Sequence, residues 1–82
     1  MERFLHYVLR QLVDFPEELV ILKEEAPKRT IFKLRLAQTD VGKVVGKSGS
    51  TIQALRNLLA AAAEKKGEKV FLEIDEEPRR QP

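Results

Sequence analysis

The spacing of the hydrophobic residues changes several times along this chain, and the order of these changes limits the folds that it can adopt. Apolar residues three and four apart are typical of an amphipathic helix, whereas alternation with polar residues is typical of a strand with one covered face. Turn residues separate the segments, as at Ala26-Pro27-Lys28 and at Gly67. The pattern predicts a helix, two strands, two helices and a strand, at residues 2–14, 19–24, 30–36, 39–45, 50–67 and 70–74.

This order of elements predicts an α+β fold in two layers, with three helices on one face of a three-stranded mixed sheet. The clearest strand signal lies in residues 30–36, where Phe32 and Leu34 alternate with Lys33 and Arg35. One face of this strand is therefore expected to pack on a core while the other meets water.

Both internal helices begin at residues that can cap them, and for the hydroxyls of Ser50 and Thr51 a hydrogen bond to a bound anion is the alternative. Thr39 or Asp40 precedes the short one, and Ser50 or Thr51 stands at the beginning of the longer one. These residue types accept a hydrogen bond from the free amides of a first helical turn.

The length and composition predict one small domain without a catalytic centre. We place the domain at residues 1–75 and a flexible charged tail at residues 76–82, which contains two prolines. The chain has no cysteine, so neither a disulfide framework nor a thiolate metal site is expected, and no cofactor is predicted. No apolar run approaches the ~20 residues that cross a membrane, and the first fourteen residues are too charged for a signal peptide. We therefore expect a cytoplasmic protein with no membrane partner.

Positive charge is concentrated in the middle of the chain. The total is +2, but residues 28–56 carry seven bases and one acid, or +6, while the remainder carries eight bases and twelve acids, or −4. This asymmetry points to an anionic partner for the middle segment, and a solvated basic face without a partner is the alternative. Binding to a polyanion would weaken as salt rises, because neutralised phosphates release counterions.

Two glycines, Gly46 and Gly49, lie three residues apart between the predicted internal helices, in the sequence DVGKVVGKSGSTI at residues 40–52. Glycine has no Cβ atom, so it lets a sugar-phosphate backbone approach the main chain and permits positive φ angles. Because the loop opens into a helix, unpaired amides and the positive end of the helix dipole are expected to face a bound phosphate. The candidate binding residues are Lys43, Val44, Val45, Gly46, Lys47, Ser48, Gly49, Ser50, Thr51, Ile52 and Arg56.

The segment Val44-Val45-Gly46-Lys47-Ser48-Gly49 resembles the (Val/Ile)-Ile-Gly-x-x-Gly signature of KH domains, and the order of elements resembles the bacterial type II arrangement. From the first helix to Ile74, including the alanine-rich longer helix, the chain is similar to the stand-alone KH family called KhpA. The resemblance implies that the loop clamps the backbone of about four nucleotides of single-stranded RNA. The bases would lie in a groove floored by Val44, Val45 and Ile52, with a strand edge opposite.

The resemblance also implies partners and a cellular role. It suggests a homodimer, or a heterodimer with a larger KH-containing protein, and a post-transcriptional regulator or RNA chaperone linked to cell shape. Many such relatives carry a basic residue directly after the second glycine, where this chain has Ser50, so we expect either weaker binding or greater dependence on Lys43 and Lys47. No aromatic residue lies in the glycine segment, so base stacking is not expected to drive recognition. Few base-reading side chains are evident there, so we expect weak sequence preference.

Two other classes of protein compete with this interpretation. A nucleotide-hydrolysing P-loop would also end in Gly-Lys-Ser, but three residues separate Gly42 from Gly46 where that loop needs four, and the chain is too short for its sheet. The single histidine, His6, has no nucleophile near it in the sequence, so no enzymatic activity is expected. The remaining alternative is a protein assembly module in which RNA binding is secondary.

Overall fold

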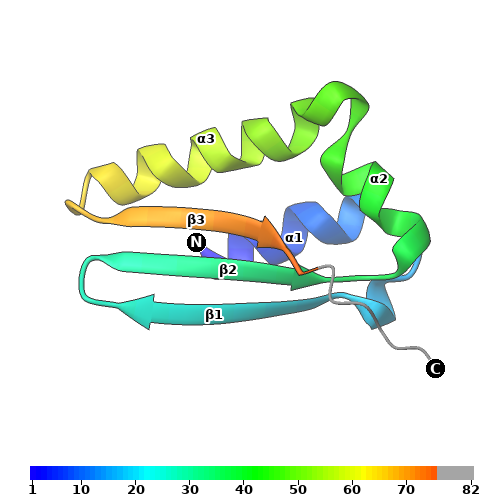
Figure 1. Ribbon diagram of the computed structural model, residues 1–82, viewed down its shortest axis with the longest axis horizontal. Coiled ribbons are helices and arrows are strands. Elements are labelled where there is room, and N and C mark those ends of the chain that lie inside the picture. Colours follow the sequence, from blue (N-terminus) through cyan, green and yellow to red (C-terminus); the bar gives the residue numbers. More distant parts are fainter. Residues whose placement is uncertain (76–82) are drawn as a thin grey trace.

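The structure is a computed structural model that describes residues 1–75. The predicted flexible tail, residues 76–82, lies outside the described residues. The elements are α1 (Glu2–Leu12), η1 (Pro16–Glu18), β1 (Val20–Ala26), β2 (Arg29–Arg35), η2 (Gln38–Asp40), α2 (Val41–Val45), η3 (Lys47–Gly49), α3 (Ser50–Glu64) and β3 (Lys69–Ile74), where η marks a short 3-10 turn. The predicted order of helices and strands is confirmed (Figure 1).

The sheet has the order β1-β2-β3 and is mixed. Strands β1 and β2 form an antiparallel hairpin in which Ile21 pairs with Leu34, whereas β2 and β3 are parallel, with Phe32 opposite Leu72. Parallel neighbours need a long crossover, and α2, the glycine loop and α3 supply it. The carboxyl ends of β2 and β3 therefore lie at the same end of the sheet, next to α2 (Figure 1).

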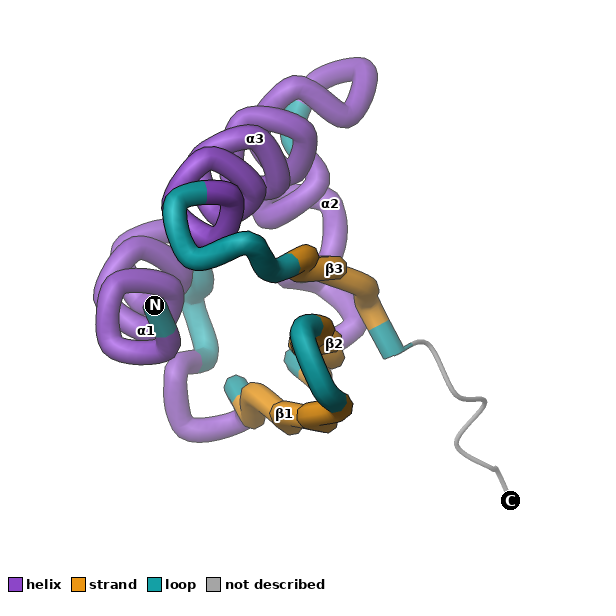
Figure 2. The backbone as a smooth tube through the Cα atoms, turned by 90° about the vertical axis from the view of Figure 1, so that its left-hand side faces the viewer, coloured by secondary structure: helices purple, strands orange, loops and turns teal. Residues whose placement is uncertain are grey.

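The helices cover one face of the sheet, and no other element of residues 1–75 covers the opposite, open face (Figure 2). Phe32 and Leu34 point into the core while Lys33 and Arg35 point to the open face, so the predicted alternation is confirmed. The fully or almost fully buried apolar side chains come from both the helices and the sheet, and they comprise Leu5, Leu9, Phe32, Leu34, Val44, Leu55, Leu59 and Leu72. The α+β fold with three helices on a three-stranded mixed sheet is thus present as predicted.

The ends of two helices differ slightly from the predicted bounds. Helix α1 ends at Leu12, because Val13 is already extended, with φ −91° and ψ 152°. Helix α3 ends at Glu64, and Gly67 adopts φ +69° three residues later, where its amide donates to the Glu64 carbonyl. Gly67 therefore closes the helix end as its sequence position indicates.

Candidate nucleic-acid interface

The glycine loop has a backbone that requires glycine at two positions for different reasons. Gly46 adopts φ +80° and Gly49 adopts φ +76°, both in the region that favours glycine. A Cβ atom at Gly46 would also stand 2.7 Å from the Thr51 Cβ and 2.8 Å from the Thr51 amide nitrogen, whereas one at Gly49 would meet no atom within 4 Å. Between them Ser48 has φ +56°, so three of the four loop residues have positive φ angles.

Some of the loop amides are used by the loop itself. The Gly49 amide donates to the Gly46 carbonyl at 3.1 Å, and the Ser50 amide donates to the Lys47 carbonyl. The amides of Lys47 and Ser48, in contrast, have no hydrogen-bond acceptor in the described part of the chain. Fewer loop amides are therefore free to bind an anion than the sequence predicts, and the free ones belong to two consecutive residues at the tip of the loop.

The expected hydroxyl caps are wrong. Helix α3 takes Gly49 as its N-cap residue, and neither Ser50 nor Thr51 makes a side-chain cap hydrogen bond. Both hydroxyl residues lie inside the first turn instead, and Thr51 fills the space beside Gly46 where a Cβ would stand. The loop glycine, rather than a serine or threonine, therefore ends the turn and begins the helix.

The carboxylate of Asp40 fixes α2 to the segment that follows α1. Asp40 occupies the N-cap position of α2 but makes no cap bond. Its side chain is 0% exposed, and its two oxygens accept hydrogen bonds from the backbone amides of Asp14 and Phe15, each at 3.0 Å. Because α2 leads directly into the glycine loop, this contact helps to set where the loop stands.

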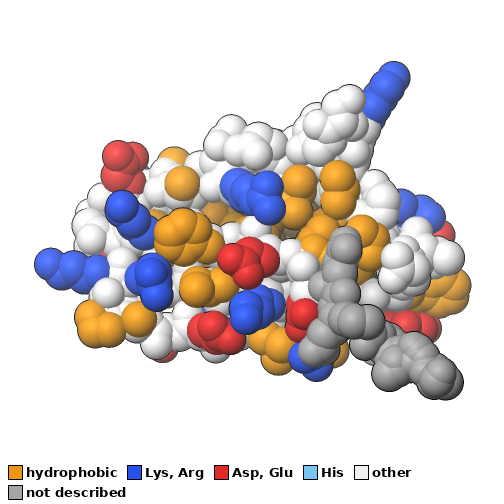
Figure 3. Space-filling model, viewed as in Figure 1, with side chains coloured by type: hydrophobic (Ala, Val, Ile, Leu, Met, Phe, Trp, Pro, Cys, Tyr) orange, Lys and Arg blue, Asp and Glu red, His pale blue; other side chains and the backbone are white. Residues whose placement is uncertain are grey.

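A groove of about 550 Å³ lies directly beneath the loop, between the start of α3 and the end of β3. Figure 3 shows hydrophobic side chains gathered between α3 and the end of β3 on this side of the molecule. A second hollow of about 420 Å³ continues along α3, and Gln53 and Arg56 line both. The first is lined by Val45, Ser48, Gly49, Ser50, Ile52, Gln53, Arg56 and Ile74.

Arg56 is held at the middle of this groove by the edge of the sheet. Its Nε atom donates to the carbonyl oxygen of Leu72 at 3.1 Å. Strand β3 is an edge strand, so this carbonyl faces α3 rather than a further strand. The side chain is otherwise exposed, and its terminal guanidinium nitrogens make no hydrogen bond or ion pair with the described part of the chain.

The remaining candidate residues have different surroundings. Val44 is 0% exposed and belongs to the core, so its side chain supports the groove from below instead of lining it. Lys47 is exposed at the tip, but Lys43 forms an ion pair with Asp14 at 3.1 Å. The sequence did not predict Gln53 and Ile74 as residues that line the groove. Gln53 could have been predicted, because it lies about one helical turn from both Ser50 and Arg56.

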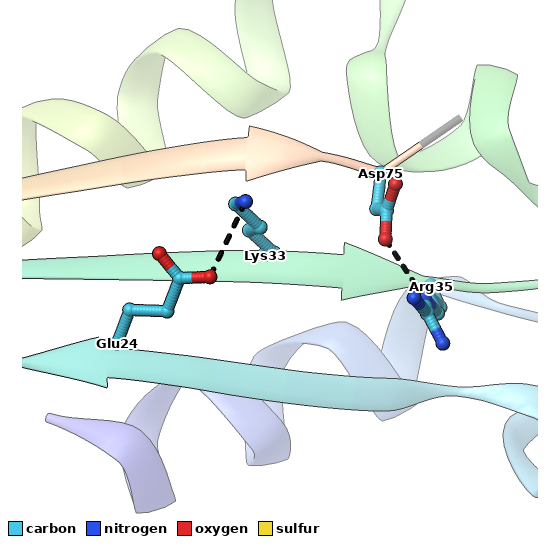
Figure 4. A network of polar contacts seen from close by, with 4 residues as sticks. All are labelled: Glu24, Lys33, Arg35 and Asp75. Carbon is cyan, nitrogen blue, oxygen red and sulfur yellow. Dashed lines mark hydrogen bonds and ion pairs between the residues drawn. The ribbon is translucent and has the colours of Figure 1, made fainter. Parts of the chain in front are cut away.

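The positive segment at residues 28–56 does not form one basic surface, which corrects the interpretation of the charge asymmetry. Lys33 pairs with Glu24 at 3.3 Å and Arg35 pairs with Asp75 at 2.8 Å. Both pairs lie on the open face of the sheet (Figure 4). With the Lys43 pair, three of the seven bases are neutralised by acids that lie outside this segment in the sequence. The cations that remain near the groove are Lys47 and Arg56.

Within residues 1–75, no group of three or more acidic or histidine side chains is placed to hold a metal ion. In the same range, no helix is long and apolar enough to cross a membrane.

A Gly-x-x-Gly loop between two helices, set beside the edge of a three-stranded mixed sheet in the order αββααβ, defines a KH domain of the type II arrangement. The family model for the KhpA/KhpB KH domain matches residues 2–74, and the chain belongs to this family. The resemblance found in the sequence is thereby confirmed.

Curated relatives cover almost the whole chain. The "RNA-binding protein KhpA" of Chlamydia pneumoniae is 43% identical over 77 residues, which are 94% of this chain and 99% of that protein. The protein of the same name from Listeria monocytogenes is 38% identical, over 93% of this chain and 100% of the relative. That of Borreliella burgdorferi is 40% identical, over 85% of each. No solved structure matches the chain.

Proposed function

We propose that the chain binds single-stranded RNA, with a phosphate at the tip of the glycine loop and the following bases in the groove between α3 and β3. The observation that carries the proposal is the pair of free amides at Lys47 and Ser48, directly beside an apolar groove. The names of the curated relatives support the same activity. KH modules in general clamp the backbone of about four nucleotides through this loop.

The surroundings of the loop suit a phosphate group. Two consecutive amides can donate to its oxygens, and the N-terminus of the 15-residue helix α3 follows at once, so the positive end of its dipole lies nearby. Lys47 adds a mobile charge at the tip. Beneath it Val45, Ile52 and Ile74 offer an apolar floor for the bases, and Arg56 offers hydrogen-bond donors.

The test replaces the tip with acids. In the double variant Lys47→Asp, Ser48→Asp, the affinity for a fluorescent oligouridylate should fall at least about tenfold, because carboxylates repel the phosphate; aspartate also tolerates the positive φ of position 48. Fluorescence anisotropy measures the affinity, and circular dichroism checks the fold. The control, Lys65→Asp with Lys66→Gln, changes the net charge equally at the far end of α3. Equal affinity for both variants would contradict the proposal.

The proposed activity is non-enzymatic and cytoplasmic, that of a post-transcriptional regulator or RNA chaperone with a role in cell shape. Recognition through the backbone and an aliphatic floor should give weak sequence preference. A selection from random oligonucleotides that converged on one tight consensus would contradict this part of the proposal.

Assembly with another protein is a second proposed function, and the outer face of α3 favours it. Leu58 is 56% exposed there, in a stripe of exposed small residues at helical spacing formed by Ala54, Ala61 and Ala62. Small residues let a second helix approach closely, so we propose that this face pairs with a second copy of the chain or with another KH-containing protein. Light scattering should show a dimer for the wild type and a monomer for Leu58→Asp. A wild-type monomer at every accessible concentration would contradict self-pairing.

A further inference from the structure

A separate concave surface lies on the exposed side of α1, away from the glycine loop. It has a volume of about 440 Å³ and is lined by Arg3, His6, Tyr7, Arg10, Gln11 and Pro16. It shares no lining residue with the groove beneath the loop. Arg3, Tyr7 and Arg10 are four and three residues apart, so they lie on one side of the helix.

The arginines of this α1 surface are not paired with acids in the described part of the chain. Among the described residues, neither Arg3 nor Arg10 makes an ion pair or a side-chain hydrogen bond, and no acid lines the cavity. Glu2, the one acid of α1, is 4.0 Å from the amino group of Lys23. The acids Glu17 and Glu18 follow Pro16 in η1 without lining the cavity.

An exposed aromatic ring stands between the two arginines. Tyr7 is 67% exposed, more than Phe4, Phe15 or Phe71. A ring of this kind offers a flat face on which a nucleobase can stack, and stacking does not depend on base identity. Arginine presents planar donors that match a phosphate in a two-pronged contact. The two arginines are about 10 Å apart along the helix axis, from a rise of about 1.5 Å per residue.

We propose that the α1 surface is a second binding site for single-stranded nucleic acid, in which a base stacks on Tyr7 and flanking phosphates contact Arg3 and Arg10. Proteins commonly bind single-stranded nucleic acids through aromatic rings flanked by cations. The absence of lining acids suits a polyanion better than a protein surface of mixed charge. The inference extends the proposed RNA-binding function to a face that the glycine loop does not reach.

The proposed site on α1 is separate from the glycine loop, so the two sites could bind different RNA segments. Figure 2 shows α1 on one side of the molecule and the edge formed by α3 and β3 on another. A single domain with both sites would hold two RNA segments at once, either two strands or distant parts of one. That arrangement raises the local concentration of one segment around the other and favours their annealing.

Nuclear magnetic resonance on the full chain separates the two sites. A six-nucleotide oligouridylate is titrated into the wild type, into Lys47→Asp with Ser48→Asp, and into Arg3→Gln with Arg10→Gln. We expect saturable shifts of the α1 amides in the wild type and in the loop variant, and shifts confined to the loop and groove in the arginine variant. Tyr7→Ala should weaken the α1 site about tenfold and Tyr7→Phe should preserve it, because phenylalanine retains the stacking face.

Salt dependence gives an independent readout. Measured in the loop variant, the slope of log affinity against log salt should become shallower by about 1.4 when Arg3 and Arg10 are replaced, since each single-strand phosphate contributes about 0.7. The control Lys65→Gln with Lys66→Gln removes the same charge elsewhere and should leave the slope unchanged.

Each outcome decides between the two sites. Shifts at the loop without any at α1 would overturn this inference and leave the proposed function intact. Shifts at α1 without any at the loop would do the reverse. If the resonances of α1 moved with protein concentration in the absence of RNA, the α1 surface would be a contact between copies of the chain. That result would also overturn the inference.

Discussion

Gly46 and Gly49 share a positive φ angle, but different surroundings constrain them. At Gly49 the constraint is conformational, because open space surrounds the position where a Cβ would stand. At Gly46 the same constraint is joined by contact with Thr51, including its backbone nitrogen. The sequence predicts that both glycines are needed. It does not show that Gly49 tolerates a side chain better than Gly46, because that difference depends on the position of Thr51 in the structure.

A series of alanine variants should separate these effects. Gly49→Ala should cost about 1–2 kcal/mol, the price of the left-handed region for a residue with a Cβ atom. Gly46→Ala should cost more, because the Thr51 backbone must also move. Gly42→Ala, in α2 with φ outside this region and no atom within 4 Å, should leave stability unchanged or raise it by about 0.5–1 kcal/mol. Urea denaturation measures all three, and equal losses at positions 46 and 49 would contradict the steric argument.

At the scale of elements, α2 is a five-residue helix that cannot hold its place by itself. Helices this short are marginal in water, so tertiary contacts must position it. Asp40 supplies such a contact through the amides of Asp14 and Phe15. No local sequence pattern predicts this contact, because the partners lie 26 and 25 residues away. An aspartate directly before a helix is instead interpreted as a cap.

Loss of this carboxylate should destabilise the whole fold. Asp40→Ala leaves two amides without acceptors, and we expect a loss of about 1–3 kcal/mol in the free energy of unfolding. Asp40→Asn keeps one carbonyl oxygen and should lose less. Thermal and urea denaturation of the three proteins test the order, with Thr39→Ala as the neighbouring control. If Asp40→Ala unfolded at the same denaturant concentration as the wild type, the contact would have no role in stability.

The elements themselves could be predicted well where periodicity was strong. Strand β2 follows the alternation of its residues closely, and α1 and α3 follow their apolar stripes. The ends and caps could not be predicted as well, since Ser50 and Thr51 have the right chemistry for a cap and lie one and two residues too late in the chain. In the candidate site, the loop was evident from its glycines, whereas Ile74 enters the groove only through the parallel pairing of β3 with β2.

At the scale of the whole molecule, charge along the sequence and charge in space differ. Lys33, Arg35 and Lys43 belong to a strongly positive segment, yet each contacts an acid from another part of the chain. Cross-strand pairing brings Glu24 close, the return of β3 brings Asp75 close, and the approach of the segment after α1 to α2 brings Asp14 close. A count of charges along the chain cannot show these contacts. The field that attracts an RNA to the groove therefore comes from fewer groups than the sequence indicates.

The salt dependence of RNA binding at the groove should reflect this smaller number. With Arg3→Gln and Arg10→Gln as background, we expect a slope of about −1.4 if Lys47 and Arg56 each meet a phosphate, compared with about −5 if all seven bases of the segment did. Asp14→Asn should steepen the slope and strengthen binding, because it releases Lys43 from its ion pair. Anisotropy titrations over a range of salt concentrations measure both, and a slope near −5 for the background protein would refute the spatial account of charge.

The space that Thr51 occupies beside Gly46 also has a kinetic consequence. A turn held by its own side chain and by hydrogen bonds at Gly49 and Ser50 does not have to be ordered by an arriving RNA. Association should then be a single encounter step, and the observed rate in a stopped-flow mixing experiment should rise in proportion to RNA concentration without reaching a plateau. Gly46 thus affects the rate at which the protein binds an RNA strand as well as the position at which the strand binds.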